Sequence, residues 1–431
     1  MSKVFKKYIE RHNAAHYLQN CSDGIEPQLI VVIPVYLERD YLSATLNSLF
    51  NCRLPQLVVE IILVFNSCET DNREVVIQQE QHISDIQKSI IPLKPDSIDV
   101  SIIRAYNLPK KIAGPGTARK IGMDSAAARF YYLGNFNGVI VSLDADSTVS
   151  RDYFINIYSR FSETDVRGAS IYFEHDTDGD QFDSDVYLSA LKYELHLRYV
   201  RASLSFARFP FAYHTVGSAI ALTALSYVSI GGMPRKQAGE DFYFLQKLIY
   251  YGGFGEINDV VVRPSSRPSN RVIFGTGAAI SSSLSGDVDL SLTYSPSAFL
   301  ELKEFLTVKD ELYYVDSEYI LDWCKNSPLL IREFLLFDSL LNNIKELKTQ
   351  CSSLSVFQKR FYELFNYFKV VKYLNFVHNT IISKESLYSS SKKLLIDNNL
   401  LPANFGGDEK ELLNLYRRLD KGGVFHPRLF F

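Results

Sequence analysis

A short stretch with two aspartates, GVIVSLDADSTVS at residues 138–150, constrains the fold of this chain most. Val139 to Ser142 form an apolar, β-branched run typical of a buried strand. Asp144 and Asp146 come directly after it, which predicts that they lie at the strand's carboxyl end, where open α/β sheets bind ligands. Two carboxylates at that edge can hold a hard divalent cation. The alternative is an acidic turn before a helix that starts near Arg151.

Other apolar runs alternate with helix-forming segments around this stretch. Such alternation predicts an α/β fold with a Rossmann-like, mostly parallel sheet flanked by helices. The expected strands are Leu29–Val35, Val59–Phe65, Val100–Arg104 and Ala169–Phe173, and a long helix is expected over Asp183–Phe206.

A second candidate site is the segment from Ala113 to Leu133, which opens with two glycines and continues as a helix-forming run. Arg119 and Lys120 lie in or near its first turns. Backbone amides and the positive end of a helix favour phosphate, and two cations strengthen that preference. A tight glycine turn followed by solvated cations is the alternative interpretation.

A third candidate is the acidic pair Glu240 and Asp241. The apolar residues after it, Phe242, Leu245 and Leu248, recur at helical spacing, which places the two carboxylates at the first turn of a helix. Taken alone, the pair could equally be a favourable helix start, because acidic residues complement the helix dipole there.

The composition sets the outer limits of the interpretation. A chain of 431 residues with 46% hydrophobic residues can form two domains, and its net charge of −3 gives no reason to expect nucleic acid as the partner. Five scattered cysteines suggest reduced thiols. There is no signal-peptide pattern and no apolar run of membrane-spanning length, so we expect a cytoplasmic protein.

The motifs, in their order, resemble family 2 glycosyltransferases of the GT-A fold. The resemblance covers roughly residues 28–265. It is carried by PVYLE, GPGTARKIGMD, LDAD, GG and GED, which lie at Pro34–Glu38, Gly114–Asp124, Leu143–Asp146, Gly231–Gly232 and Gly239–Asp241.

This resemblance implies a reaction and a set of roles. The enzyme would move a sugar from a nucleotide-diphosphate sugar to a hydroxyl of a carbohydrate or lipid-linked acceptor, with Mn²⁺ or Mg²⁺ held by Asp146 and Asp144. Asp241 would be the catalytic base of an inverting reaction, with retention at the anomeric carbon as the alternative outcome. The residues implied in donor binding are Pro34, Tyr36, Glu38, Asn66, Arg119 and Asp144.

Departures from the family pattern qualify these roles. The second strand ends in FNSCET where acidic residues commonly contact uracil, so the nucleotide base is open, and Lys120 replaces a usual Asn. No QxxRW motif follows GED, which indicates a non-processive enzyme. Five further residues are candidates for acceptor binding or for a lid: Glu240, Gly217, His214, Arg267 and Arg271. The loop that carries the two arginines could instead be a solvated linker.

The expected organisation has three parts. An N-terminal helical segment, 1–27, precedes a GT-A domain over 28–285, and a mainly helical domain follows over 297–431. In the last part, Lys359, Arg360, Lys369 and Lys372 lie among aromatic residues, which leaves peripheral contact with a membrane surface open. A nucleotidyltransferase, or a non-catalytic nucleotide- or sugar-binding protein of the same fold, is the alternative function.

Overall fold

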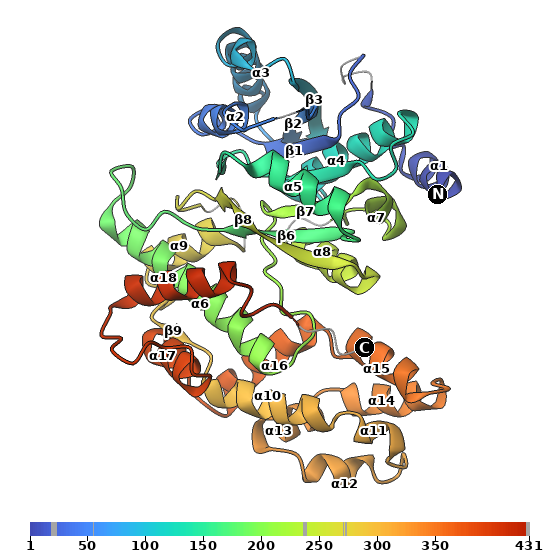
Figure 1. Cartoon of the computed structure of the whole chain (residues 1–431), viewed down its shortest axis with the longest axis vertical. Coiled ribbons are helices and arrows are strands. Elements are labelled where there is room, and N and C mark those ends of the chain that lie inside the picture. The colour runs from blue at the N-terminus through green and yellow to red at the C-terminus, as the bar shows by residue number, and fades with distance from the viewer. Residues whose placement is uncertain (19–23, 55, 236–238, 270, 272–273, 428–431) are drawn as a thin grey trace. The chain divides into compact units, whose positions relative to one another are not determined.

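The computed structural model describes residues 1–18, 24–54, 56–235, 239–269, 271 and 274–427. The chain divides into two compact units. An α/β unit comprises Met1–Phe182 and Thr215–Ser281, and a helical unit comprises Asp183–His214 and Ser282–Phe431. Their elements are labelled in Figure 1.

An eight-stranded sheet, in the order β3-β2-β1-β4-β7-β6-β8-β5, forms the core of the α/β unit. Strands β1, β2, β3 and β4 pair in parallel, and so do β6 and β8. β7 runs antiparallel to both of its neighbours, and β5 runs antiparallel to β8. The strands are β1 Leu29–Val35, β2 Val59–Cys68, β3 Ile98–Leu108, β4 Val139–Ser142, β5 Thr148–Val149, β6 Gly168–Phe173, β7 Ile220–Thr223 and β8 Phe254–Arg263.

The strand β1 lies between β2 and β4, and all seven of its residues are buried. This explains why its sequence is apolar throughout instead of alternating. Pro34 pairs with Val64 of β2 but lies beyond the end of the β4 pairing, which stops at Val32. The missing N–H of the proline therefore removes no ladder bond on the β4 side.

Helices cover the sheet of the α/β unit (Figure 1). α4, which begins directly after Gly114, packs against β1 and β2. The N-terminal helix α1 packs against α4 and α7, where the Tyr8 hydroxyl donates to Asp124 at 2.7 Å. The helices are α1 Ser2–His12, α2 Leu42–Phe50, α3 Arg73–Ser89, α4 Pro115–Tyr132, α5 Tyr153–Glu163, α7 Ala224–Ser229 and α8 Glu240–Tyr251, with the short 3-10 helix η2 Ile91–Leu93. The boundary between the units falls within α9 Thr276–Leu284, after Ser281.

The helical unit contains α6 and most of the C-terminal part of the chain. Its only sheet within the described residues is the antiparallel pair of β9 and β10. The elements are α6 Ser184–Phe206, β9 Leu292–Thr293, α10 Pro296–Val308, α11 Glu311–Tyr314, α12 Ile320–Lys325, α13 Leu329–Phe337, α14 Leu340–Thr349, α15 Leu354–Leu364, α16 Tyr367–Thr380, β10 Glu385–Ser386, α17 Leu387–Asp397 and α18 Glu409–Lys421. The predicted fold class, a mostly parallel α/β sheet followed by helices, is confirmed.

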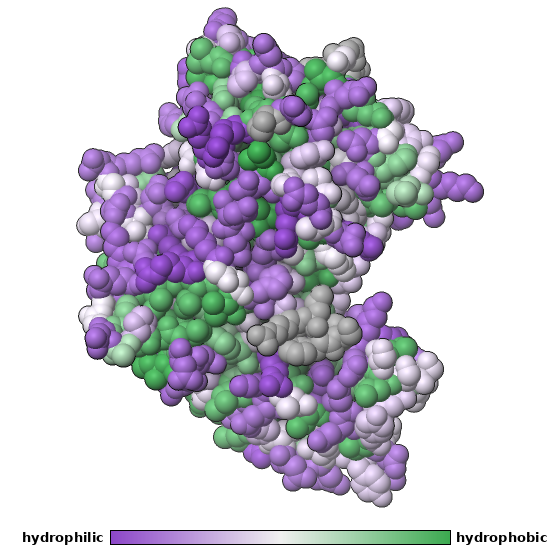
Figure 2. All heavy atoms as spheres, viewed as in Figure 1, coloured by the Kyte–Doolittle hydropathy of each residue, from purple (hydrophilic) through white to green (hydrophobic). Residues whose placement is uncertain are grey.

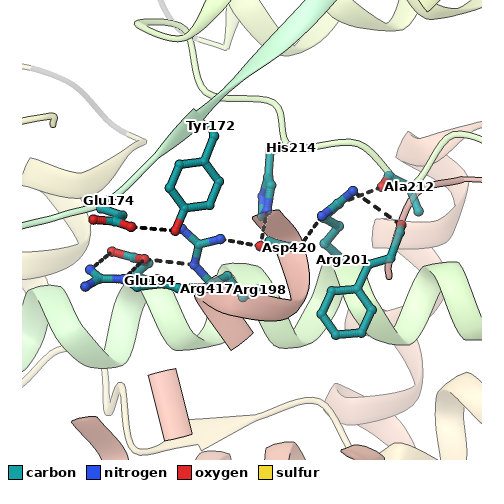
Figure 3. Close-up of polar contacts among 10 residues, drawn as sticks. Tyr172, Glu174, Glu194, Arg198, Arg201, Ala212, His214, Arg417 and Asp420 are labelled. Atoms are coloured by element: carbon teal, nitrogen blue, oxygen red, sulfur yellow. Dashed lines mark hydrogen bonds and ion pairs between the residues drawn. The ribbon is translucent and has the colours of Figure 1, made fainter. Parts of the chain in front are cut away.

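The division into units differs from the expected boundaries at α6, which we placed inside the domain 28–285. A buried ion network joins α6 to α18 within the helical unit (Figure 3). Arg198 and Arg201 of α6 both pair with the buried Asp420, and Arg417 pairs with Glu194 at 2.8 Å. These charges lose solvation on burial and depend on one another for compensation, which fixes α6 to the C-terminal helix.

The surface of the helical unit bears on the question of membrane contact. Phe357 and Phe361, which lie beside the basic candidates Lys359 and Arg360, are buried, so they add nothing to an exposed apolar surface. Figure 2 shows apolar side chains gathered over α17 and β9, and the exposed ones on these elements and α6 include Leu188, Leu292 and Ile396. Of the basic candidates, Lys369 and Lys372 both pair with Asp338. No helix within the described residues has the length and apolar character needed to cross a membrane.

Candidate functional site

The two aspartates of the LDAD motif follow β4 as the sequence predicts. The backbone carbonyl of Ala145, between them, accepts a hydrogen bond from the Thr45 hydroxyl at 2.8 Å, and Ala145 itself is buried. This contact fixes the turn that presents the two carboxylates. The Asp144 side chain is 39% exposed and the Asp146 side chain 20%. Both carboxylates therefore reach the solvent.

Arg119 of α4 connects this turn to the start of α8. Its guanidinium is buried and contacts Asp144 Oδ1 at 2.7 Å and a carboxylate oxygen of Glu240. Burial alone would lower the pKa of Arg119, but the two carboxylates raise it above its ordinary value. Arg119 thus remains charged and joins two of the predicted site motifs, LDAD and GED, although it lies 25 residues from Asp144 and 121 residues from Glu240 in the sequence.

Asp241 lies in the first turn of α8, and its Oδ1 accepts a hydrogen bond from the Phe242 amide at 2.8 Å. Burial raises the pKa of Asp241, and the nearby Asp144 raises it further, although Arg119 acts in the opposite direction. Gly217 lies against this carboxylate, because a Cβ built on it would be 2.7 Å from Asp241 Oδ2. A side chain at position 217 would therefore displace the carboxylate.

Glu240 lies beside Asp241 but is buried. Burial raises the pKa of Glu240, while its partner Arg119 lowers it. Of the two carboxylates at the start of α8, Glu240 orients Arg119, whereas Asp241 is partly open to solvent.

Two arginines of the loop after β8 form ion pairs with acidic side chains of the site. Arg267 Nε contacts Asp146 Oδ2 at 2.8 Å, and its Nη2 contacts Glu38 at 2.8 Å. Arg271 contacts the same Glu38 at 2.7 Å and the backbone carbonyl of Tyr36 at 2.7 Å. The loop is therefore attached to the site by ion pairs and is not a solvated linker.

Asp146 has a strongly perturbed acidity. Burial raises its pKa to about 6, and the neighbouring carboxylates Asp144 and Glu38 add to this, while Arg267 lowers it. A further positive charge beside Asp146 would therefore stabilise its ionised form.

The residues expected near the nucleoside lie where β1 and β2 end. Pro34 is in β1, and Asn66 of β2 donates through Nδ2 to the backbone carbonyl of Val35 at 3.0 Å. Tyr36 follows β1 directly, and burial together with Asp71 raises the pKa of its hydroxyl. The structure therefore brings Pro34, Tyr36, Glu38 and Asn66 to one edge of the sheet.

His214 is the one candidate that belongs to the helical unit. Its Nε2 lies 3.2 Å from Asp420 Oδ2, in the ion network of α6 and α18 (Figure 3). Burial lowers the pKa of His214. Its contacts in that unit are structural ones.

Two residues of the site were not predicted from the sequence. The guanidinium of Arg267 stacks over the Tyr41 ring at 4.4 Å, and Asp71 accepts a hydrogen bond from the Cys68 amide at 2.8 Å. Tyr41 fits the apolar spacing of α2, so its sequence position gave no indication of a cation partner. Asp71 lies just after FNSCET, where an acidic residue was sought a few positions earlier.

An open α/β sheet with acidic and basic side chains at the carboxyl ends of its strands defines a class of ligand-binding and catalytic proteins. Residues 30–215 match the family model for glycosyl transferase family 2. The expected family is thereby confirmed over this segment, which identifies it as a glycosyltransferase domain. A comparison with curated proteins found no match.

The chain is also similar to solved structures of S. aureus TarS residues 1–349. Against the structure without a named ligand, the identity is 12% and the TM-score 0.38, covering 79% of this chain and 92% of the other. Against the complex with UDP, the identity is 14% and the TM-score 0.39, covering 80% of this chain and 90% of the other. Against the complex with UDP-GlcNAc, the identity is 12% and the TM-score 0.39, covering 94% of this chain and 93% of the other. The likeness is too distant to carry a functional conclusion.

Proposed function

We propose that the chain transfers a sugar from a nucleotide-diphosphate sugar to a hydroxyl of a carbohydrate or lipid-linked acceptor, with inversion at the anomeric carbon. The observation that carries the proposal is the state of Asp241. It is a carboxylate on the rigid first turn of α8, with a raised pKa and with a glycine opposite it. Such a group is suited to accept a proton from an alcohol.

A divalent cation, Mn²⁺ or Mg²⁺, fits the side chains at the end of β4. Asp144 and Asp146 supply the carboxylate oxygens that such cations prefer, and both reach solvent. Within the described residues, no group of three or more His, Cys, Asp or Glu side chains is arranged to hold a metal ion. The remaining ligands would therefore be donor phosphate oxygens and water. When bound, the cation would neutralise charge on the departing diphosphate.

Arg119 and Asp241 act beside the proposed cation, one by orienting carboxylates and the other on the acceptor hydroxyl. Arg119 orients Asp144 and Glu240 through buried contacts, which keeps the turn after β4 in register with α8. Asp241 would take the proton of the acceptor hydroxyl as the oxygen attacks the anomeric carbon from the face opposite the diphosphate. An attack in one step from that face gives inversion.

Binding of a nucleoside diphosphate tests the donor part of the proposal. Ligands that bind the native state raise the melting temperature, so Mn²⁺ with the correct nucleoside diphosphate should stabilise the protein more than either alone. Asp146→Ala should lose this metal-dependent stabilisation. Equal stabilisation of wild type and variant, with Mn²⁺ and with chelator, would contradict a cation held by Asp146.

Product analysis tests the reaction itself. Once a donor and an acceptor support turnover, NMR of the product reports the configuration of the anomeric carbon. Inversion agrees with a single attack assisted by Asp241, whereas a retained centre would remove that role.

A further inference from the structure

Arg267 bridges two carboxylates that reach the site from different strands. Its Nε and Nη2 lie 2.8 Å and 2.7 Å from the same oxygen of Asp146, and Nη2 also lies 2.8 Å from Glu38. The ring of Tyr41 lies against the guanidinium. Thus one carboxylate oxygen of Asp146, the proposed ligand of the divalent cation, is already paired with the guanidinium of Arg267.

The charge of the site explains why the arginine lies there. Five carboxylates gather with three guanidinium groups, so the carboxylates are in excess: Glu38, Asp144, Asp146, Glu240 and Asp241 against Arg119, Arg267 and Arg271. Two of these carboxylates, Asp146 and Glu38, contact Arg267 directly. Arg267 supplies positive charge beside both.

Resting on the proposed function, we propose that Arg267 competes with the divalent cation for Asp146 and, once displaced, binds the nucleoside diphosphate. A cation at Asp146 repels the guanidinium and takes its acceptor oxygen. The contacts with Glu38 and Tyr41 keep Arg267 at the site after this exchange. Its Nε–H and Nη–H donors then face anionic oxygens of the diphosphate, for which a guanidinium is well suited.

The exchange predicts opposite effects of one substitution on two ligands. Without Arg267, Asp146 has no competing cation, so Mn²⁺ alone should bind more tightly, by about tenfold for a unit charge removed at contact distance. The same substitution removes a diphosphate donor, so inorganic pyrophosphate with Mn²⁺ should bind about tenfold more weakly. A residue that served only the fold would weaken both ligands.

Arg271 provides the matched control. It lies in the same loop and holds the same Glu38, but its other contact is the Tyr36 carbonyl, 2.7 Å away, instead of Asp146. Arg271→Ala therefore removes the same charge from the loop without freeing Asp146. Its effect on Mn²⁺ alone should be less than half that of Arg267→Ala.

The experiment measures Mn²⁺ binding to the full chain by electron paramagnetic resonance of the free ion, and pyrophosphate binding by calorimetry at saturating Mn²⁺. Wild type, Arg267→Ala, Arg267→Gln, Arg271→Ala and Asp146→Asn are compared after circular dichroism confirms folding. The glutamine variant keeps most of the side chain if the alanine variant fails to fold. Tighter Mn²⁺ and weaker pyrophosphate in the Arg267 variants support the exchange.

Two other outcomes overturn it, in different ways. If Mn²⁺ binds through Asp146 but the Arg267 variants change both ligands in the same direction, the exchange is wrong and the proposed cation site stands. If neither wild type nor the Arg267 variants bind Mn²⁺, both the exchange and the cation site are wrong. Sugar transfer in chelator would then show that the glycosyltransferase activity survives without them.

Discussion

At the scale of single residues, Asp241 separates an enzyme from a binding protein. Asp241→Asn keeps the shape and the hydrogen bond from the Phe242 amide but cannot take the acceptor proton. We expect kcat to fall by about a hundredfold or more while donor binding persists. Turnover assays and calorimetry measure the two effects. Asp259→Asn, an exposed change on β8, is the matched control and should retain activity.

The raised pKa of Asp241 also predicts a pH dependence. A base must be deprotonated to act, so kcat/KM should rise with pH through the pKa of Asp241. Burial and Asp144 raise that pKa, which places the acidic limb of the profile above the range of an ordinary aspartate. The limb should disappear in Asp241→Asn. An identical limb in the variant would assign the titration to another group.

At the same scale, the sequence predicted the positions of the candidate site residues on strands and helices better than their contacts. Asp144, Asp146 and Asp241 could be found because each lies at a recognisable strand end or helix start. The pairing of Arg119 with Glu240, and that of Arg267 with Asp146, could not be found. Each pair is separated by 121 residues, and only the completed sheet brings its members together.

At the scale of elements, apolar run length decided what could be predicted. The bounds of β1 and β4 agree with the expected ones, because both strands are buried on all sides. β7 was missed because Ile220–Thr223 lies within a longer apolar run that suits a helix equally well. The helix α6 was predicted, but its partner α18 was not. Periodicity shows which face of a helix is buried and not which element covers that face.

The glycine pair after α7 gives a prediction at this scale. Gly231 and Gly232 both have positive φ, 83° and 69°, but only a Cβ on Gly232 would meet another group, the Tyr8 hydroxyl of α1 at 1.8 Å. Gly231→Ala should cost about 1 kcal/mol in unfolding free energy from backbone strain. Gly232→Ala should cost about 2–4 kcal/mol more, because it also displaces α1.

Chemical denaturation of the two variants measures this difference. Tyr8→Phe removes the nearest clashing atom, so the double variant with Gly232→Ala should lose less stability than the sum of the single losses. Equal losses for Gly231→Ala and Gly232→Ala would mean that α1 does not depend on the close approach of Tyr8 to this turn.

At the scale of the whole molecule, the two units partly bury titratable groups of opposite kinds. In the helical unit the pKa of the half-buried His196 is lowered to about 4 by desolvation and by Lys384. Its Nδ1 lies 2.8 Å from the Thr293 hydroxyl. In the α/β unit the pKa of the partly exposed Asp146 is raised to about 6, chiefly by desolvation. The sequence showed both residues, but it could not show which would be removed from water.

These shifts predict that His196 and Asp146 contribute to the stabilities of their units in opposite directions as the pH falls. Between pH 7 and pH 5 the unfolded chain protonates His196 while the folded helical unit does not, so its unfolding free energy falls by about 1–2 kcal/mol. Over the same range the folded α/β unit protonates Asp146 while the unfolded chain does not, which adds about 1 kcal/mol to its stability. Calorimetry in chelator at both pH values, on wild type, His196→Gln and Asp146→Asn, should show the two contributions. His196→Gln should reduce the acid loss in the helical unit, to which the lowered pKa of His214 also contributes, and should leave the contribution of Asp146 unchanged. An equal acid loss in wild type and variant would contradict the assignment to His196.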